Sequence, residues 1–194
     1  MPHRRVAFTR GGYYHIYNRG RNGEAIVFEE RNYLFLLQQV KQRTTLMRIT
    51  VIAYCLMPNH YHFLFRQEGD TSISVLMQRI FNSYTKAINT AYRRSGPLFD
   101  GPFKALPVTE ETYLLHLCRY IHRNPLEAGL VTHPSQWPYS NYLEWVGLRS
   151  GSLVDRKLVQ AYFPTPKDYE QFVIEYTPPR AVEEIVRGLS LEDG

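Results

Sequence analysis

Two segments of the chain carry apolar residues at the three- and four-residue spacing of a helix. The first runs from about Glu29 to Lys41 and the second from about Ser72 to Tyr92. Residues at this spacing lie on one side of a helix, so each segment predicts a helix with one face to bury. The apolar positions are Tyr33, Leu34, Leu36, Leu37 and Val40 in the first segment, and Ile73, Leu76, Met77, Ile80, Tyr84, Ala87 and Ile88 in the second.

Three other segments are rich in aromatic and β-branched residues and predict strands. They span residues 12–18, 48–56 and 60–65, with the sequences GYYHIYN, RITVIAYCL and HYHFLF. Only the tripeptide Met-Pro-Asn separates the last two segments, and Pro and Asn both favour turns. We therefore predict an antiparallel hairpin over residues 48–65.

The second half of the chain is more irregular. Residues 93–103 (RRSGPLFDGPF) contain two Gly-Pro breakers and predict a loop, and the following KALPV segment predicts a short edge strand. Residues 152–176 indicate two short helices, separated at the sequence FPTP.

A third long helix is predicted between these parts. Thr109 is suited to cap its start, and Glu110 and Glu111 would then lie in its first turn. We expect it to end at about Asn124, because Pro125 disfavours helical geometry in the residue before it.

The order of these elements predicts an α+β fold. Strand, helix, strand, strand, helix, strand is the ferredoxin-like split βαβ order, an antiparallel sheet with two helices on one face. The third long helix would then lie on the open side of the sheet. We divide the chain into a domain of residues 1–148 and a short helical C-terminal extension of unknown role, residues 149–194.

Composition narrows the class of protein. The chain of 194 residues has 23 Lys plus Arg against 18 Asp plus Glu, a net charge of +5 that modestly favours an anionic partner such as nucleic acid. No segment approaches the roughly 20 apolar residues of a membrane span, and the first ten residues lack the apolar run of a signal peptide. Cys55 and Cys118 lie in apolar segments and predict reduced thiols. We expect a cytoplasmic protein with no membrane partner and no small-molecule cofactor.

A His-x-His pair is the first candidate for chemistry. Alternate residues of a strand point to one side, so His60, His62 and Leu64 share one face of their strand and the aromatic residues between them share the other. The two imidazoles would lie about 6.5–7 Å apart along the strand, within reach of one metal ion. A structural pair of histidines fits this spacing equally well.

The third long helix carries the second candidate. Tyr113, Leu117, Tyr120 and Asn124 fall on one narrow stripe, and Tyr120 and Asn124 are one turn apart. A phenol beside an amide oxygen suits phosphoryl transfer, in which the phenol attacks phosphorus and the amide completes a metal shell. The alternative is a core aromatic and a helix-terminating Asn.

Several segments together resemble one family. MPNHYHFLF resembles the His-hydrophobic-His signature of the IS200/IS605-like HUH tyrosine (Y1) transposases, and LCRYIHRNPLEAGLV resembles their tyrosine motif. GPLFDGPFKA and WPYSNY are similar to the stretches before and after that motif. The likeness covers roughly residues 8–145 and is closest to the REP-associated branch. The chain departs from many relatives at Pro102, where they carry Arg.

The resemblance implies a site and an activity. It implies Tyr120 as the nucleophile, and His60, His62 and Asn124 as ligands of a divalent metal ion, Mg²⁺ or else Mn²⁺. It also implies nicking and rejoining of single-stranded DNA, with an adjacent hairpin, through a 5′-phosphotyrosine intermediate. We expect the protein to be a transposase that acts as a monomer or as a homodimer.

Other roles follow less directly from the sequence. His116, one turn before Tyr120, is a candidate general base. Two other functions are alternatives to that of a transposase. One is a single-stranded nucleic-acid-binding module without covalent chemistry, and the other is a metal nuclease that activates water. A structural protein with a satisfied histidine pair is a third alternative. Basic residues that could contact DNA phosphates are Arg4, Arg5, Arg10, Arg19, Arg21 and Lys104.

Overall fold

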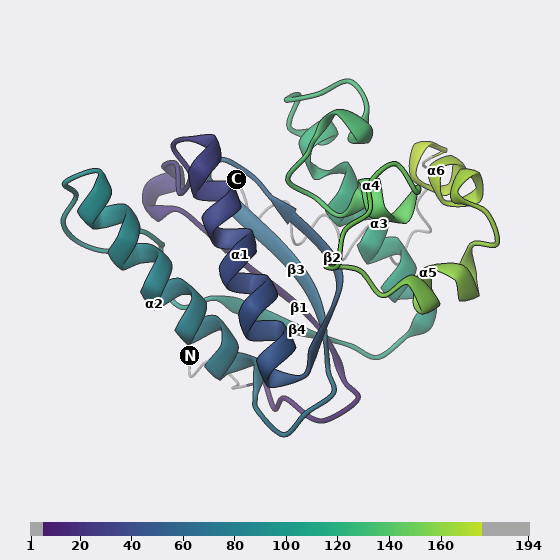
Figure 1. Cartoon of the computed structure of the whole chain (residues 1–194), viewed down its shortest axis with the longest axis horizontal. Helices are drawn as coiled ribbons and strands as arrows, with labels where there is room; N and C mark the ends of the chain where they lie inside the picture. The colour runs from purple at the N-terminus through teal and green to yellow at the C-terminus, as the bar shows by residue number, and fades with distance from the viewer. Residues whose placement is uncertain (1–5, 176–194) are drawn as a thin grey trace.

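A four-stranded antiparallel sheet forms the centre of the computed structural model, which describes residues 6–175 (Figure 1). Within these residues, no helix is both long and apolar enough to cross a membrane. The elements are β1 (Tyr13–Arg19), η1 (Arg21–Gly23), α1 (Glu30–Met47), β2 (Ile49–Leu56), β3 (His60–Gln67), α2 (Ile73–Ala91), β4 (Lys104–Val108), α3 (Glu111–Glu127), η2 (Pro134–Gln136), α4 (Tyr142–Trp145), α5 (Arg156–Tyr162) and α6 (Pro166–Ile174).

The strand order confirms the ferredoxin-like prediction. The sheet runs β2-β3-β1-β4, and all three neighbouring pairs are antiparallel. β2 and β3 form the expected hairpin, which the Met57 amide closes by donating to the His60 carbonyl at 2.9 Å. β1 lies beside β3, so residues near the start of the chain pair directly with the histidine strand.

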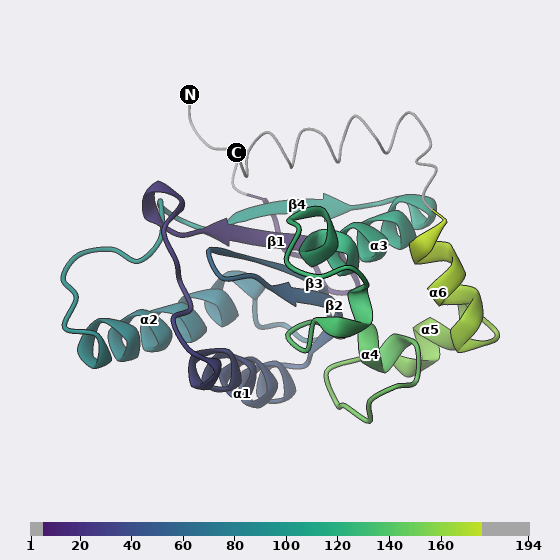
Figure 2. The same ribbon diagram turned by 90° about the horizontal axis from the view of Figure 1, so that it is seen from above.

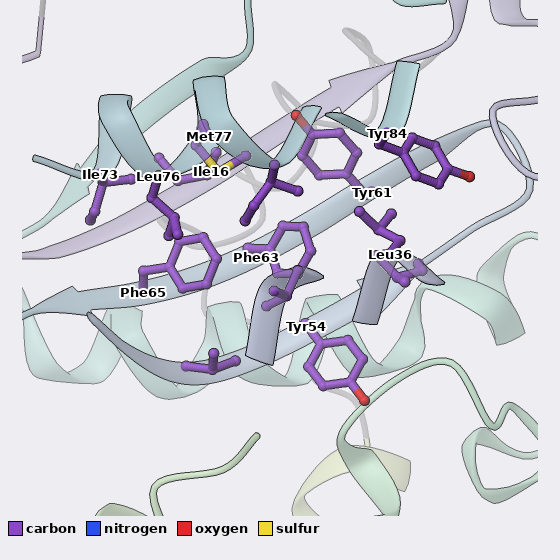
Figure 3. Packing of buried hydrophobic residues seen from close by; sticks show 14 of the residues in the cluster. Ile16, Leu36, Tyr54, Tyr61, Phe63, Phe65, Ile73, Leu76, Met77 and Tyr84 are labelled. Carbon is purple, nitrogen blue, oxygen red and sulfur yellow. The ribbon is translucent and has the colours of Figure 1, made fainter. Parts of the chain in front are cut away.

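One face of the sheet packs against α1 and α2, as the alternation of β3 predicts. Tyr61, Phe63 and Phe65, which alternate with the histidines and Leu64, point to this face and are buried with apolar residues of both helices. Figure 3 shows them beneath α2, with α1 beside them. The labelled residues of this core are Ile16, Leu36, Tyr54, Tyr61, Phe63, Phe65, Ile73, Leu76, Met77 and Tyr84.

The other face is covered by α3 and by the helices that follow it. Figure 1 shows α1 and α2 to the left of the sheet and α3 to α6 to its right, and Figure 2 shows α6 beside α3. A second buried cluster fills this side, with Leu64 of β3, Ile52 of β2 and Ile121 of α3 among its members. The predicted position of the third long helix, on the open side of the sheet, is therefore confirmed.

The bounds of two helices differ from those predicted. α1 continues beyond Lys41 to Met47, and its C-cap residue Arg48 takes a left-handed conformation, with φ 53°. α3 begins one residue later than expected, because Glu110 rather than Thr109 occupies the N-cap position. These shifts lengthen α1 and leave the order of the elements unchanged.

The predicted end of α3 at Asn124 is wrong, because the helix continues through Pro125 to Glu127. Pro125 has no backbone N–H to donate, but it lies in the last turn of the helix. The last carbonyl groups of the helix accept hydrogen bonds from residues that follow it. Gly129 donates to Leu126 and Leu130 donates to Pro125, each at 3.0 Å. With Gly129 at φ +69°, these bonds form a Schellman motif. Asn124 therefore stands inside a helix of defined geometry.

A polar side chain ties the segment before α4 to the edge of the sheet. β2 carries a bulge between Val51 and Ala53, and Asn141 bonds to the backbone beside it. The Asn141 amide nitrogen donates to the Ile52 carbonyl at 2.9 Å, and its oxygen accepts from the Tyr54 amide at 2.8 Å. Asn141 is completely buried, so these bonds have no competition from water.

We expect Asn141→Ala to lower the free energy of unfolding by about 3 kcal/mol, because it leaves buried backbone groups without partners. Urea denaturation followed by circular dichroism measures this difference. As a control, Gln171→Ala removes an exposed side-chain bond to Glu175 and should change the free energy by less than about 0.5 kcal/mol. Equal effects of the two substitutions would contradict the role given to Asn141.

Candidate active site

The histidine pair lies on the face of the sheet that α3 covers. His62 stands opposite Tyr17 of β1 and is completely buried, while His60 stands opposite Arg19 at the end of the strand and is half-buried. Residues opposite each other in an antiparallel pair share a face, so this register places His60, His62, Tyr17 and Arg19 on one face of the sheet.

The side chains of α3 meet the two histidines. The Nε2 atom of His60 lies 2.8 Å from Oδ1 of Asn124, and the Nε2 atom of His62 lies 3.4 Å from Nδ2 of the same amide. The ring of Tyr120 stands edge-on to His62, with 5.4 Å between ring centroids and 76° between the planes. The structure thus brings together His60, His62, Asn124 and Tyr120, although the first two come from a strand and the others from a helix.

The other ring nitrogen of His60 is bonded to the turn before β3. His60 Nδ1 lies 2.8 Å from Oδ1 of Asn59, and Asn59 donates its amide nitrogen to the Gly23 carbonyl at 3.3 Å. That second bond orients the Asn59 oxygen toward His60, so a proton on Nδ1 of His60 has an acceptor there. In that tautomer the Nε2 lone pair of His60 faces the oxygen of Asn124, and a cation between them would relieve the repulsion.

Three of these side chains, His60, His62 and Asn124, fit a divalent metal ion. Metal–nitrogen and metal–oxygen bonds are about 2.0–2.2 Å long, so two ligand atoms at right angles around one ion lie about 3 Å apart. The 2.8 Å separation between Nε2 of His60 and Oδ1 of Asn124 matches this geometry, and Nε2 of His62 lies 3.4 Å from the nitrogen of the same amide. Residues 6–175 contain no group of three His, Cys, Asp or Glu placed to hold a metal. The expected ligand set has only two such residues, because its third member is an amide.

A third histidine, which the sequence analysis did not single out, lies behind His62. His15 of β1 is completely buried, and its Nε2 atom lies 3.0 Å from Nδ1 of His62. Burial lowers the pKa of His15 to about 3, and burial together with the neighbouring His60 and His15 lowers the pKa of His62 well below its usual value. Both rings are therefore neutral at physiological pH, the state in which imidazole binds metals.

A signal for His15 was present in the sequence. In GYYHIYN, the alternation of a strand puts His15 and Tyr17 on one face, as it does for His60 and His62. The pairing of β1 with β3 is what makes the two faces coincide, and the strand pattern alone does not determine which strands are neighbours.

A separate buried histidine fixes α3 against the sheet. His122 makes two bonds, from Nδ1 to the Tyr169 hydroxyl at 2.6 Å and from Nε2 to Oδ1 of Asn141 at 2.8 Å. Because Asn141 is bonded to β2, this chain of side chains links α3 to both the sheet and α6. His122 lies between Tyr120 and Asn124 in the sequence, so it holds the part of the helix that carries both.

Arginines on the outer side of α3 add contacts to α6. Arg119 donates to the Phe172 carbonyl at 3.1 Å, and Arg123 donates to the Val173 carbonyl at 2.9 Å. The described part of the predicted C-terminal extension, residues 149–175, is thus packed on the helix that bears Tyr120. Residues 176–194 of that extension lie outside the described residues, and its division from residues 1–148 stays a prediction.

We expect the stability of the metal-free protein to fall as the pH drops from about 6.5 toward 4. Burial lowers the pKa of His122 to about 4, so in this range the unfolded chain binds a proton that the folded chain does not. One such histidine contributes at most about 1.4 kcal/mol per pH unit. Urea denaturation at several pH values in EDTA measures the slope, and His122→Gln should reduce it. An unchanged slope in that variant would contradict the assignment.

The predicted DNA-contacting residues do not all lie near the site. Arg19 lies opposite His60 and pairs with Asp100 at 2.9 Å, and Lys104 stands over the ring of Tyr17 at 5.5 Å. These two border the site. Exposed Arg21 follows β1 in η1, whereas exposed Arg10 precedes β1, at the end away from His60. Arg4 and Arg5 lie outside the described residues.

Two further predicted residues occupy other surroundings. His116 bonds to Arg119, with 2.7 Å between the nitrogens, and its ring lies against Phe172 of α6. Burial and the Arg119 charge lower the pKa of His116, which weakens it as a general base. The Tyr113 hydroxyl is buried without a hydrogen-bond partner among the described residues, and burial raises its pKa. Tyr120, rather than Tyr113, is the tyrosine whose ring contacts His62.

Comparison with known proteins identifies the fold and the family of this chain. The chain is 23% identical, over 160 residues, to a protein of Haemophilus influenzae described as "Putative REP-associated tyrosine transposase", with 73% of this chain and 86% of that protein covered. A solved structure of a REP-associated tyrosine transposase bound to a REP hairpin superposes with a TM-score of 0.66 and 22% identity, covering 80% of this chain and 94% of that one, and shows the same fold. The family model described as "Transposase IS200 like" matches residues 9–124. The chain thus belongs to the IS200-like transposase family.

Proposed function

We propose that this protein nicks and rejoins single-stranded DNA, with Tyr120 as the attacking group. The observation that carries the proposal is the meeting of Tyr120, on α3, with the two histidines and Asn124. A tyrosine used only for packing would not require a polar cluster of this kind beside it. Membership of a transposase family supports strand transfer as the outcome.

The reaction conserves the phosphodiester bond energy. The Tyr120 oxygen forms a bond to the scissile phosphorus while the bond from phosphorus to the 3′ oxygen breaks. The phenol loses its proton as it attacks, and the departing 3′ oxygen takes one up. The products are a 5′-phosphotyrosine link and a free 3′ hydroxyl. Attack by a 3′ hydroxyl of another strand reverses these steps and rejoins DNA without a nucleotide cofactor.

His60, His62 and Asn124 would hold a divalent ion, Mg²⁺ or Mn²⁺, beside Tyr120. When bound, the ion supplies positive charge to a non-bridging phosphate oxygen and stabilises the charge that develops in the transition state. The chain itself contributes position. Helix α3 carries Tyr120 and Asn124 one turn apart, and the His122 network holds that helix on the sheet.

Hairpin-containing DNA is the substrate that we propose. The superposable transposase structure is described as bound to a REP hairpin, and that likeness supports a hairpin next to the cleaved strand here. Arg19 and Lys104 border the site on the same face of the sheet, where phosphates of the scissile strand would pass.

The test uses oligonucleotides that carry a hairpin with single-stranded flanks. The full chain is incubated with end-labelled DNA and Mg²⁺ or Mn²⁺, and the products are separated on a denaturing gel. We expect a protein–DNA band that disappears with EDTA, and mass spectrometry should place the nucleotide on the α3 peptide. Cleavage without a protein-linked product would indicate a water-activating nuclease instead. Binding without cleavage would indicate a binding module.

A further inference from the structure

We propose that His15 is a positioning residue that sets the proton arrangement of His62 for metal binding. This inference rests on the proposed function, because it concerns the same metal site. His15 does not touch the position where the metal would lie, and it acts through His62. Its role is to accept the Nδ1 proton of His62, so that the His62 Nε2 lone pair points toward Asn124.

The geometry of the two rings supports a directed hydrogen bond. The nitrogens lie 3.0 Å apart, the ring centroids 5.2 Å apart, and the ring planes differ by only 17°. In two rings stacked face to face, the centroids would lie about as far apart as the facing nitrogens. Here the centroids lie much farther apart than the nitrogens, so the nitrogens point toward each other along the line that joins the rings. The two imidazoles are therefore nearly coplanar and edge to edge, with the bond in the plane of both rings.

The direction of the bond follows from the other side of His62. The Asn124 amide nitrogen lies 3.4 Å from Nε2 of His62 and can only donate to it. A neutral His62 that accepts at Nε2 carries its proton on Nδ1, and that proton has His15 as its acceptor. The same arrangement is required for a metal bound at Nε2.

Among the described residues, His15 makes no other side-chain hydrogen bond, although its ring also lies against that of Tyr17, with 4.9 Å between centroids. Its second ring nitrogen, Nδ1, is buried without a hydrogen-bond partner among the described residues. An unpartnered buried polar atom lowers the stability of the folded protein. An apolar residue on this face of β1 would avoid that cost, so stability alone does not account for a histidine here. Orienting a metal-bound imidazole through its second nitrogen does account for it.

His60 is oriented in the same way but by a different partner. Its Nδ1 atom lies 2.8 Å from Oδ1 of Asn59, a residue of the turn before β3. The two ligands therefore have separate partners, Asn59 for His60 and His15 for His62. A change at His15 should then affect one ligand and leave the other in place, which weakens the metal site without abolishing it.

The experiment compares Mn²⁺ binding by the wild-type chain, His15→Gln and His15→Leu, measured by calorimetry. We expect His15→Leu to weaken binding about 10- to 100-fold. His15→Gln should stay within a few-fold of the wild type, because its amide oxygen can accept the same proton. Thermal unfolding in EDTA checks that each variant folds. Equal Mn²⁺ affinity in all three proteins would overturn the inference, whereas no Mn²⁺ binding by the wild type would instead contradict the proposed metal site.

A second measurement needs no variant. Long-range ¹H–¹⁵N NMR correlations of the metal-free wild-type chain report which nitrogen of each neutral histidine carries the proton. We expect His62 to carry it on Nδ1. A proton on Nε2 of His62 would mean that His15 is the donor, and it would overturn the inference even if the His15→Leu variant failed to fold.

Discussion

We expect Tyr120→Phe to form no covalent adduct with hairpin-containing single-stranded DNA, and its cleavage rate to fall by at least about 10⁴-fold. The substitution removes a single oxygen, the atom that we propose forms the bond to phosphorus. Loss of a nucleophile costs this much in enzymes that form covalent intermediates. Denaturing gels with end-labelled DNA measure both the adduct and the cleaved strand.

Tyr113→Phe is the matched control, since Tyr113 lies two turns earlier on α3 and its hydroxyl has no hydrogen-bond partner among the described residues. This variant should form adducts at the wild-type rate. Tyr120→Phe should still bind the DNA and Mn²⁺, because the ring and the ligands stay in place. An adduct that persists in Tyr120→Phe and is lost in Tyr113→Phe would show that the nucleophile is misassigned.

We expect His62→Ala to lose Mn²⁺ binding and DNA cleavage together. His62 is the buried member of the histidine pair, with Asn124 on one side and His15 on the other. Without its imidazole, only His60 and Asn124 would be left to bind the ion from the chain, and we expect the Mn²⁺ dissociation constant to rise more than about 100-fold. Calorimetry measures the binding, and the gel assay measures cleavage.

His133→Gln serves as the control for this substitution. His133 lies in a surface turn, where it bonds to Ser135, and it takes no part in the site. Metal binding and cleavage should both be unchanged. The His62→Ala and Tyr120→Phe variants should also differ from each other. His62→Ala should lose both Mn²⁺ binding and cleavage, whereas Tyr120→Phe should keep Mn²⁺ binding and lose the covalent adduct. Full Mn²⁺ affinity in His62→Ala would remove His62 from the ligand set.

Local patterns were enough to predict the fold class of this protein. The period of two in HYHFLF assigned the histidines to one face of β3 and the aromatic residues to the other, and burial of Phe63 and Phe65 against α1 and α2 confirms that assignment. These predictions succeed because side-chain direction within one strand or helix depends only on its own geometry. The end of α3 was misjudged because a residue beyond the helix, Gly129, decides how its carbonyls are satisfied.

The site itself was only partly accessible from the sequence. Tyr120 and Asn124 could be placed one turn apart, and His60 and His62 on one side of a strand, but no local pattern states that this helix faces this strand. That contact depends on long-range packing, including the His122 bonds to Asn141 and Tyr169.

The same reason applies to His15. The alternation that puts His15 and Tyr17 on one face of their strand was visible in the sequence. Contact between His15 and His62, however, depends on β1 lying beside β3 in one particular register. Strand pairing is set by the whole sheet and its turns, since a shift of one residue would send His15 to the opposite face. The sequence by itself therefore determined which residues could perform the chemistry, and the tertiary structure alone decided which of them meet.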